Sequence, residues 1–97
     1  MQIGRVIGDV VATRKDPALD GITLLVVQPL GPSREPQGRP IVAVDSVGAG
    51  LGELVMFCQG SSARLAPNLK DAPVDAVIIG IVDTVDVLGK EIYNAKQ

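Results

Sequence analysis

The segment IVAVDSVGAGLGELVMFCQ, residues 41–59, decides the fold. It begins with the apolar run Ile41–Val47, passes through the glycine-rich stretch Asp45–Glu53 and ends with the apolar run Leu54–Gln59. Valine and isoleucine are stiff at the first side-chain torsion and favour strands. The second run is nearly all apolar, so both faces of its strand must be covered. The segment therefore predicts two consecutive strands joined by a tight turn.

The spacing of Gly48, Gly50 and Gly52 raises the question of a phosphate-binding loop. A Walker loop needs a Lys-Ser/Thr pair after its glycines and a helix that receives the phosphate, and the dinucleotide fingerprint needs a helix too. Here Glu53 follows the last glycine and a strand begins, so both interpretations fail. A tight turn explains one or two of the glycines. All three together with Ala49 leave a backbone almost free of side chains, which can pack against copies of itself or border a hole.

Similar strand and turn patterns extend to both sides of this segment. Three further strands are predicted, over Ile3–Thr13, Ile22–Leu30 and Ala76–Val87, the last with a bend at Gly80. Gly60–Ala66 predicts a short helix, because Ser61 or Ser62 can cap it and Pro67 stops it. Five short strands in about 100 residues are typical of a partly open barrel of the oligonucleotide-binding (OB) type. We expect residues 1–97 to form a single all-β domain with this barrel, its helix lying between the fourth and fifth strands.

Glycine and proline also mark the connections of the predicted barrel. Gly4 and Gly8 lie inside the first strand, where glycine marks a bulge, a sharp bend or a close backbone approach. Gly31–Pro40 is a proline-rich surface loop. The end of the chain predicts a C-terminal extension with a turn at Gly89 and a small apolar patch at Ile92 and Tyr93.

The composition excludes several classes of function. The chain has a net charge of −2 and 2% aromatic residues, whereas nucleic-acid binders carry a basic patch and stacking aromatics. Histidine is absent and there is one cysteine, so neither a histidine or multi-cysteine metal site nor an internal disulfide is expected. No apolar run approaches the ~20 residues of a membrane span. We expect a cytoplasmic protein with no cofactor, no metal, no nucleic-acid partner and no membrane contact.

No group of side chains in the sequence predicts catalysis. Ser61 and Ser62 have no histidine to activate them, so a helix cap is the favoured role. Glu53 has two interpretations that the sequence leaves open. The first is a surface acid or a cap on exposed amides, and the second is a partner across a subunit interface for a base such as Arg5 or Arg64. A lone carboxylate makes a poor active site, and we expect the protein not to be an enzyme.

Three stretches together resemble a known family. MQIGRVIGDVVATRKDPALDG, DSVGAGLGELVMFCQGSSAR and VDAVIIGIVDTVDV are similar, in this order and spacing, to the EutN/CcmL family of bacterial microcompartment vertex proteins. They cover more than half of the chain. The glycine-rich turn, the apolar strand and the Gly-Ser-Ser-Ala-Arg segment carry most of the resemblance.

The resemblance implies a structural role in the shell of a bacterial microcompartment. It implies an OB-type barrel that assembles into a homopentamer, with a hexamer as the alternative ring, and that caps shell vertices beside hexameric shell proteins. Residues expected around a central pore on the fivefold axis are Val47, Gly48, Ala49 and Gly50. Residues expected at subunit contacts are Arg5, Gly52, Glu53, Ser61, Ser62, Arg64, Ile92 and Tyr93. A single-stranded nucleic-acid binding module on the same barrel is the alternative function, and it rests on fold analogy alone.

Overall fold

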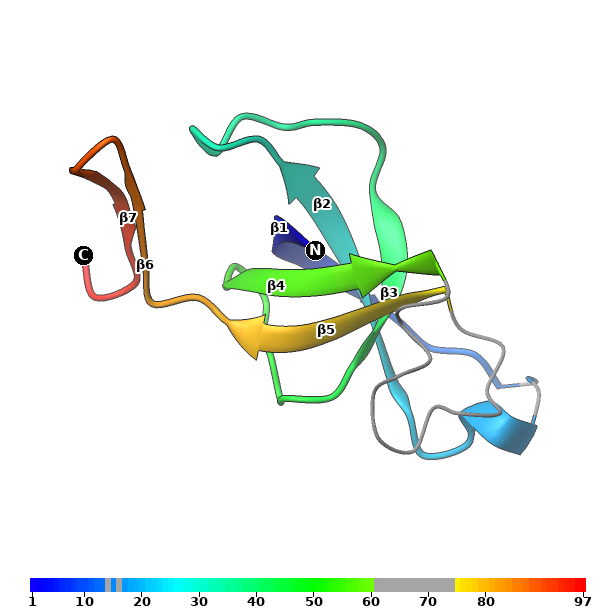
Figure 1. The fold of residues 1–97 in the computed structure, drawn as a ribbon. Helices are drawn as coiled ribbons and strands as arrows, with labels where there is room; N and C mark the ends of the chain where they lie inside the picture. Colours follow the sequence, from blue (N-terminus) through cyan, green and yellow to red (C-terminus); the bar gives the residue numbers. More distant parts are fainter. Residues whose placement is uncertain (14, 16, 61–74) are drawn as a thin grey trace.

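A computed structural model describes residues 1–13, 15, 17–60 and 75–97, and its main body is a small β-barrel (Figure 1). Five strands pair around the barrel in the order β1-β2-β3-β5-β4. Their bounds are β1 Gln2–Val10, β2 Thr23–Leu30, β3 Ile41–Asp45, β4 Leu54–Gln59 and β5 Ala76–Ile81. A short 3-10 turn, η1 (Pro17–Leu19), precedes β2. The five-stranded all-β barrel predicted from the sequence is therefore confirmed.

The barrel closes through a short parallel seam. β1 runs antiparallel to both β2 and β4, and β2 runs antiparallel to β3. β3 and β5 are parallel and pair only through Val44 with Val77 and Asp45 with Ile78. The Ser46 hydroxyl extends this seam by donating a 2.6 Å hydrogen bond to the Ile78 carbonyl. The expected barrel was partly open, and this narrow seam is what closes it.

The core is built almost entirely from aliphatic side chains and one aromatic ring. Its largest fully buried side chains are Phe57, Leu54, Ile78, Val6, Val27, Val55 and Val77. Gly4 lies beside them at a close approach of strands, since a Cβ there would lie 2.5 Å from a Val27 methyl and 2.9 Å from the Gln28 carbonyl. The prediction of a close approach or bulge at the first strand's glycines is confirmed, because the β1–β2 register also shifts between Val6 and Gly8.

The last predicted strand is in fact two strands in different sheets. β5 ends at Ile81, and β6 (Thr84–Val87) pairs with β7 (Lys90–Asn94) in a separate two-stranded hairpin. Val82 is buried and its amide donates to the Leu54 carbonyl at 2.8 Å, so the chain leaves the barrel immediately after this residue. The single strand predicted over Ala76–Val87 was wrong at this point. The helix expected over Gly60–Ala66 lies, beyond Gly60, outside the described residues.

The hairpin extends to one side of the barrel and gives the molecule principal-axis extents of 45 × 23 × 23 Å (Figure 1). Its two-residue turn is Leu88-Gly89, as the predicted turn at Gly89 requires. Val85 and Tyr93, at its base, pack against a cluster formed by Leu30, Leu54 and Val82 of the same chain. Within the described part of the chain, no helix is long and apolar enough to cross a bilayer.

Candidate functional site

The glycine-rich turn between β3 and β4 is organised by the carboxylate of Asp45. This carboxylate accepts hydrogen bonds from three successive backbone amides, those of Val47 (3.0 Å), Gly48 (3.1 Å) and Ala49 (2.8 Å). Aspartate favours such turns because its short side chain reaches amides two to four residues ahead. Ala49 also packs against the main core cluster. The first half of the turn is thus fixed both by a charge-assisted network and by apolar packing.

The second half of the turn is fixed by Glu53 and Arg5. The Glu53 carboxylate accepts a 2.5 Å hydrogen bond from the Gly50 amide, and its own amide donates to the Gly50 carbonyl at 3.1 Å. The Arg5 guanidinium donates to the Gly52 carbonyl at 2.6 Å. Of the two interpretations of Glu53, the amide cap is the one the structure contains. Its contact with a neighbouring subunit stays a prediction.

Two glycines supply backbone conformations that other residues rarely adopt. Gly48 has φ +80° and Gly52 has φ +85°, and a Cβ at either position would meet nothing within 4 Å. Glycine is required there by conformation and not by space. Gly50 differs, because its φ is ordinary and an added Cβ would lie 3.2 Å from the Glu53 carboxylate. The sequence prediction of a tight turn is confirmed, with positive φ as the reason for Gly48 and Gly52 and a close side-chain contact at Gly50.

This turn is unsuited to phosphate binding. The amides of Val47, Gly48, Ala49 and Gly50 already donate to the protein's own carboxylates, whereas a phosphate loop leaves its amides to the ligand. Two carboxylates at the turn would also repel an anion. What the arrangement offers is a hydrogen-bonded turn at the surface of the barrel, with small residues from Gly48 to Gly50 and exposed apolar side chains at Val47 and Leu51.

The structure brings together some of the predicted site residues and separates others. The pore candidates from Val47 to Gly50 lie on one turn with the interface candidates Gly52 and Glu53. The interface candidate Arg5, on β1, contacts this turn through the Gly52 carbonyl. Ile92 and Tyr93 lie on the separate hairpin. Ser61, Ser62 and Arg64 lie outside the described residues.

The proline-rich loop after β2 contacts the hairpin. Its residue Arg34 has φ +67°, and the guanidinium lies 5.5 Å from the centroid of the Tyr93 ring. The Gly31 amide donates to the Glu35 carbonyl at 2.7 Å, which folds the start of the loop back on itself. Loop and hairpin therefore support each other, and one ring face of Tyr93 is used within its own chain.

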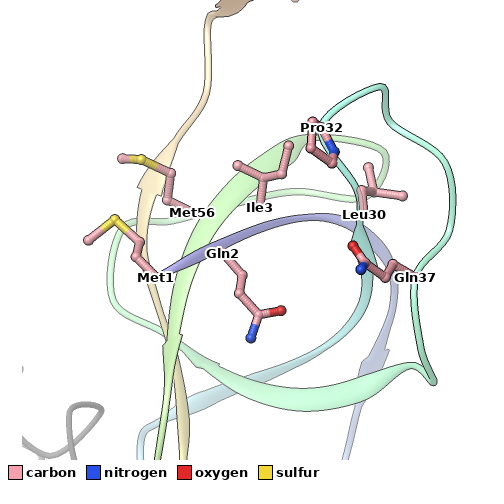
Figure 2. A pocket seen from close by; sticks show the side chains of 7 residues that line it. All are labelled: Met1, Gln2, Ile3, Leu30, Pro32, Gln37 and Met56. Carbon is pink, nitrogen blue, oxygen red and sulfur yellow. The ribbon is translucent and has the colours of Figure 1, made fainter. Parts of the chain in front are cut away.

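An open groove lined by apolar side chains and two glutamines lies at the start of β1. Figure 2 shows Met1, Ile3, Leu30, Pro32 and Met56 lining it, with the amides of Gln2 and Gln37 beside them. Its volume is about 750 Å³. None of the lining side chains is titratable, so these side chains offer no acid–base chemistry.

Two residues important to these features were missed by the sequence interpretation. Asp45 was quoted within the glycine-rich stretch but was given no role, although an aspartate shortly before a turn glycine is a recognisable signal. Leu88 was passed over because an isolated leucine before a glycine carries no pattern. Among the described residues, no three His, Cys, Asp or Glu side chains lie together in a way that could hold a metal ion.

Comparison with known proteins gives one consistent result. The family model described as "Ethanolamine utilisation protein EutN/carboxysome" matches residues 1–83. The carboxysome shell vertex protein CcmL of Gloeobacter violaceus is 46% identical over 97 residues, covering 100% of this chain and 97% of that protein. The microcompartment shell vertex protein EutN of Escherichia coli is 40% identical, covering 97% of this chain and 99% of that protein.

Solved structures agree with the sequence relatives. The structure of Gloeobacter violaceus CcmL superposes with a TM-score of 0.95 at 45% identity and covers all of both chains. The pentameric microcompartment shell protein GrpN from Rhodospirillum rubrum superposes with a TM-score of 0.83 at 46% identity, covering 91% of this chain and 100% of that chain. These relatives are shell proteins, in keeping with the expected absence of an enzymatic role.

Proposed function

The chain belongs to the EutN/CcmL family, and on that premise we propose that it is a structural shell protein that forms a homopentamer at the vertices of a bacterial microcompartment. The observation that carries the proposal is the similarity over the whole chain, in sequence and in structure, to shell vertex proteins. The GrpN structure, described as pentameric, supports the fivefold ring. As part of a bacterial microcompartment shell, the protein lies in the cytoplasm.

Geometry gives the ring its purpose. A flat layer of hexagonal tiles cannot close on itself without fivefold tiles. One heterologous interface, repeated until the rotation closes, makes such a tile from identical chains. Hexameric shell proteins are the proposed neighbours at each edge of the pentamer.

The glycine-rich turn is the proposed lining of the fivefold axis, through Val47, Gly48, Ala49 and Gly50. Five identical turns can approach one axis closely only if they carry small side chains and hold one conformation. The Asp45 and Glu53 hydrogen bonds supply the fixed conformation, and Gly48, Ala49 and Gly50 supply the small size, while Val47 is the largest side chain of the proposed lining.

The proposed subunit contacts adjoin this turn. Arg5, Gly52 and Glu53 lie beside it in the same chain, while Ser61, Ser62 and Arg64 are proposed from the family resemblance alone. Ile92 and Tyr93 are proposed to contact the adjacent protomer. Both side chains are only half-buried within their own chain, so part of each is free for this contact.

Shell closure tests the proposal. The protein would be co-expressed with a hexameric shell protein from a compartment of its relatives, and particles would be imaged by electron microscopy. Closed polyhedra that incorporate the chain at their vertices are expected, with open sheets or tubes when it is omitted. Identical assemblies with and without the chain would contradict a vertex role.

The nucleic-acid alternative gains no support from the relatives, and it has its own test. Fluorescence anisotropy with a labelled single-stranded oligonucleotide at low salt should show no binding, because the net charge is −2 and stacking aromatics are scarce. Binding that weakens steeply with added salt would revive the alternative.

A further inference from the structure

The tip of the β6–β7 hairpin combines two features that are each unfavourable in an isolated chain. Leu88 has φ +53° and Gly89 has φ +77°, the geometry of a two-residue type I′ turn. Such turns favour Asn-Gly or Asp-Gly, because a leucine side chain is strained at positive φ. Leu88 is also fully exposed to solvent. The turn residue thus departs from local turn chemistry and presents a large apolar side chain at the end of an arm.

Contacts at its base fix the direction in which the β6–β7 hairpin leaves the barrel. Val85 and Tyr93 pack against the cluster of Leu30, Leu54 and Val82, and Arg34 lies over the Tyr93 ring. The Ala95 amide donates to the Asp83 carbonyl at 2.8 Å, which ties the end of β7 to the start of the arm. Because the base of the hairpin is fixed in this way, Leu88 at the tip contacts neither the barrel nor the groove at the start of β1 in its own chain.

The groove has the chemistry to receive this side chain from another molecule. Five of its lining residues, Met1, Ile3, Leu30, Pro32 and Met56, are apolar and two, Gln2 and Gln37, are polar (Figure 2). Its volume of about 750 Å³ admits a leucine side chain with part of the turn. Methionine side chains adapt their shape to an incoming group. The Leu88 side chain, called the knob below, and the groove therefore lie on the same chain but do not contact each other within it.

The buried area decides which molecule supplies the knob. A stable complex with a separate partner buries roughly 1,200–2,000 Å² in total, far more than a two-residue turn can cover. The tip can therefore only add to an interface that other surfaces already form. In a ring of identical chains that interface is heterologous, so each contact joins two different surfaces of the chain, one from each neighbour. The Leu88 side chain and the groove, which lie on different parts of the chain, can serve as such a pair.

We propose that Leu88 is an intersubunit anchor, which inserts into the groove of Met1, Ile3, Leu30, Pro32 and Met56 of a second copy of this chain. The proposal rests on the ring put forward under the proposed function. It assigns the adjacent-protomer contact of the hairpin to its tip, a residue that the sequence interpretation did not consider. The family model matches residues 1–83, and Leu88 lies beyond that match, on the hairpin that follows the barrel.

The substitution Leu88→Asn separates docking from folding. Asparagine is the preferred first residue of this turn, so the hairpin itself should form at least as well as before. Loss of one buried leucine side chain at each contact should raise the protomer concentration at which the ring half-dissociates roughly 10- to 100-fold. Val11→Asn is the matched control, because Val11 is 85% exposed and lies outside the hairpin and the groove. Mass photometry across a dilution series measures the effect.

An unchanged ring midpoint for Leu88→Asn, or an equal loss for Val11→Asn, would overturn the anchor. Absence of any ring in the unsubstituted protein would instead count against the proposed function. The two failures are therefore distinguishable.

A cross-linking experiment tests the groove directly. In a Cys58→Ala background, a chain with Leu88→Cys is mixed with a differently tagged chain carrying Pro32→Cys, and the mixture is oxidised mildly. A disulfide between the two tagged chains is expected, and the pairing of Leu88→Cys with Val11→Cys should give none. Cross-links that are absent from the first mixture or equal in both would overturn the assignment of the groove.

Discussion

Replacing Asp45 with alanine should loosen the glycine-rich turn and lower the stability of the protein. The carboxylate accepts hydrogen bonds from the amides of Val47, Gly48 and Ala49 at 2.8–3.1 Å. Hydrogen bonds to charged groups are each worth about 1.5–3 kcal/mol, but these three share one half-exposed acceptor and solvent replaces part of the loss. We therefore expect a net destabilisation of about 2–3 kcal/mol, well below the sum of three separate bonds.

Asp45→Asn provides a graded comparison. An asparagine retains one acceptor oxygen, which can serve the amides of Val47 and Gly48, but its amide nitrogen cannot accept from Ala49. A loss of about 1 kcal/mol is expected. Asp9→Ala, the removal of an exposed aspartate on β1, is the control and should change stability by less than about 0.5 kcal/mol.

The assay is denaturant unfolding at one fixed protomer concentration, because ring assembly contributes to apparent stability. Hydrogen exchange at the amides of Gly48 and Ala49 should accelerate in the alanine variant, while the β4 core amides keep their protection. If Asp45→Ala unfolds at the same denaturant concentration as the parent and its turn amides exchange no faster, the account of the turn is refuted.

Three further predictions concern glycines and the arm. Gly52→Ala should cost about 1–2 kcal/mol in unfolding free energy because φ is +85°, whereas Gly50→Ala, at an ordinary φ, should cost less; the reverse order would contradict the conformational argument. Gly4→Ala places a Cβ 2.5 Å from a β2 methyl and 2.9 Å from a β2 carbonyl, so the unfolding free energy should fall by about 2–4 kcal/mol. An unfolding temperature in calorimetry equal to that of the parent would argue against this close contact. Arg34→Ala removes the cation over the Tyr93 ring. Hydrogen exchange in the hairpin should speed up roughly two- to fivefold, consistent with a cation–π energy of about 0.5–1 kcal/mol, and exchange in the barrel should stay unchanged. Equal hairpin exchange in the parent and in Arg34→Ala would show that this contact does not hold the hairpin.

The barrel was predictable because its strands carry strong local signals. Leu54–Gln59 was predicted with the bounds that β4 has, since six nearly all-apolar residues follow directly on a turn. The single strand predicted over Ala76–Val87 failed because β-favouring residues resume after one polar residue, Asp83, between β5 and β6, so the sequence pattern gives only a weak sign of the break. The break depends on the buried side chain of Val82 and its hydrogen bond to Leu54, and tertiary contacts of this kind leave no periodic trace in the chain.

The candidate site was only partly accessible from the sequence. The glycine spacing marked the turn, and the missing lysine and helix excluded a phosphate loop. The role of Asp45 is local and could have been found from turn chemistry. The role of Leu88 could not, because exposure and positive φ at that residue emerge only when the hairpin leaves the barrel.

The central claim is a ring of five identical chains, and native mass spectrometry tests it most directly. At micromolar concentration a ring of five chains predicts a dominant species of about 50 kDa, five times the 10.1 kDa protomer. A dominant species of 10.1 kDa, or a closed ring of about 60 kDa, would contradict the pentameric vertex protein proposed for this sequence.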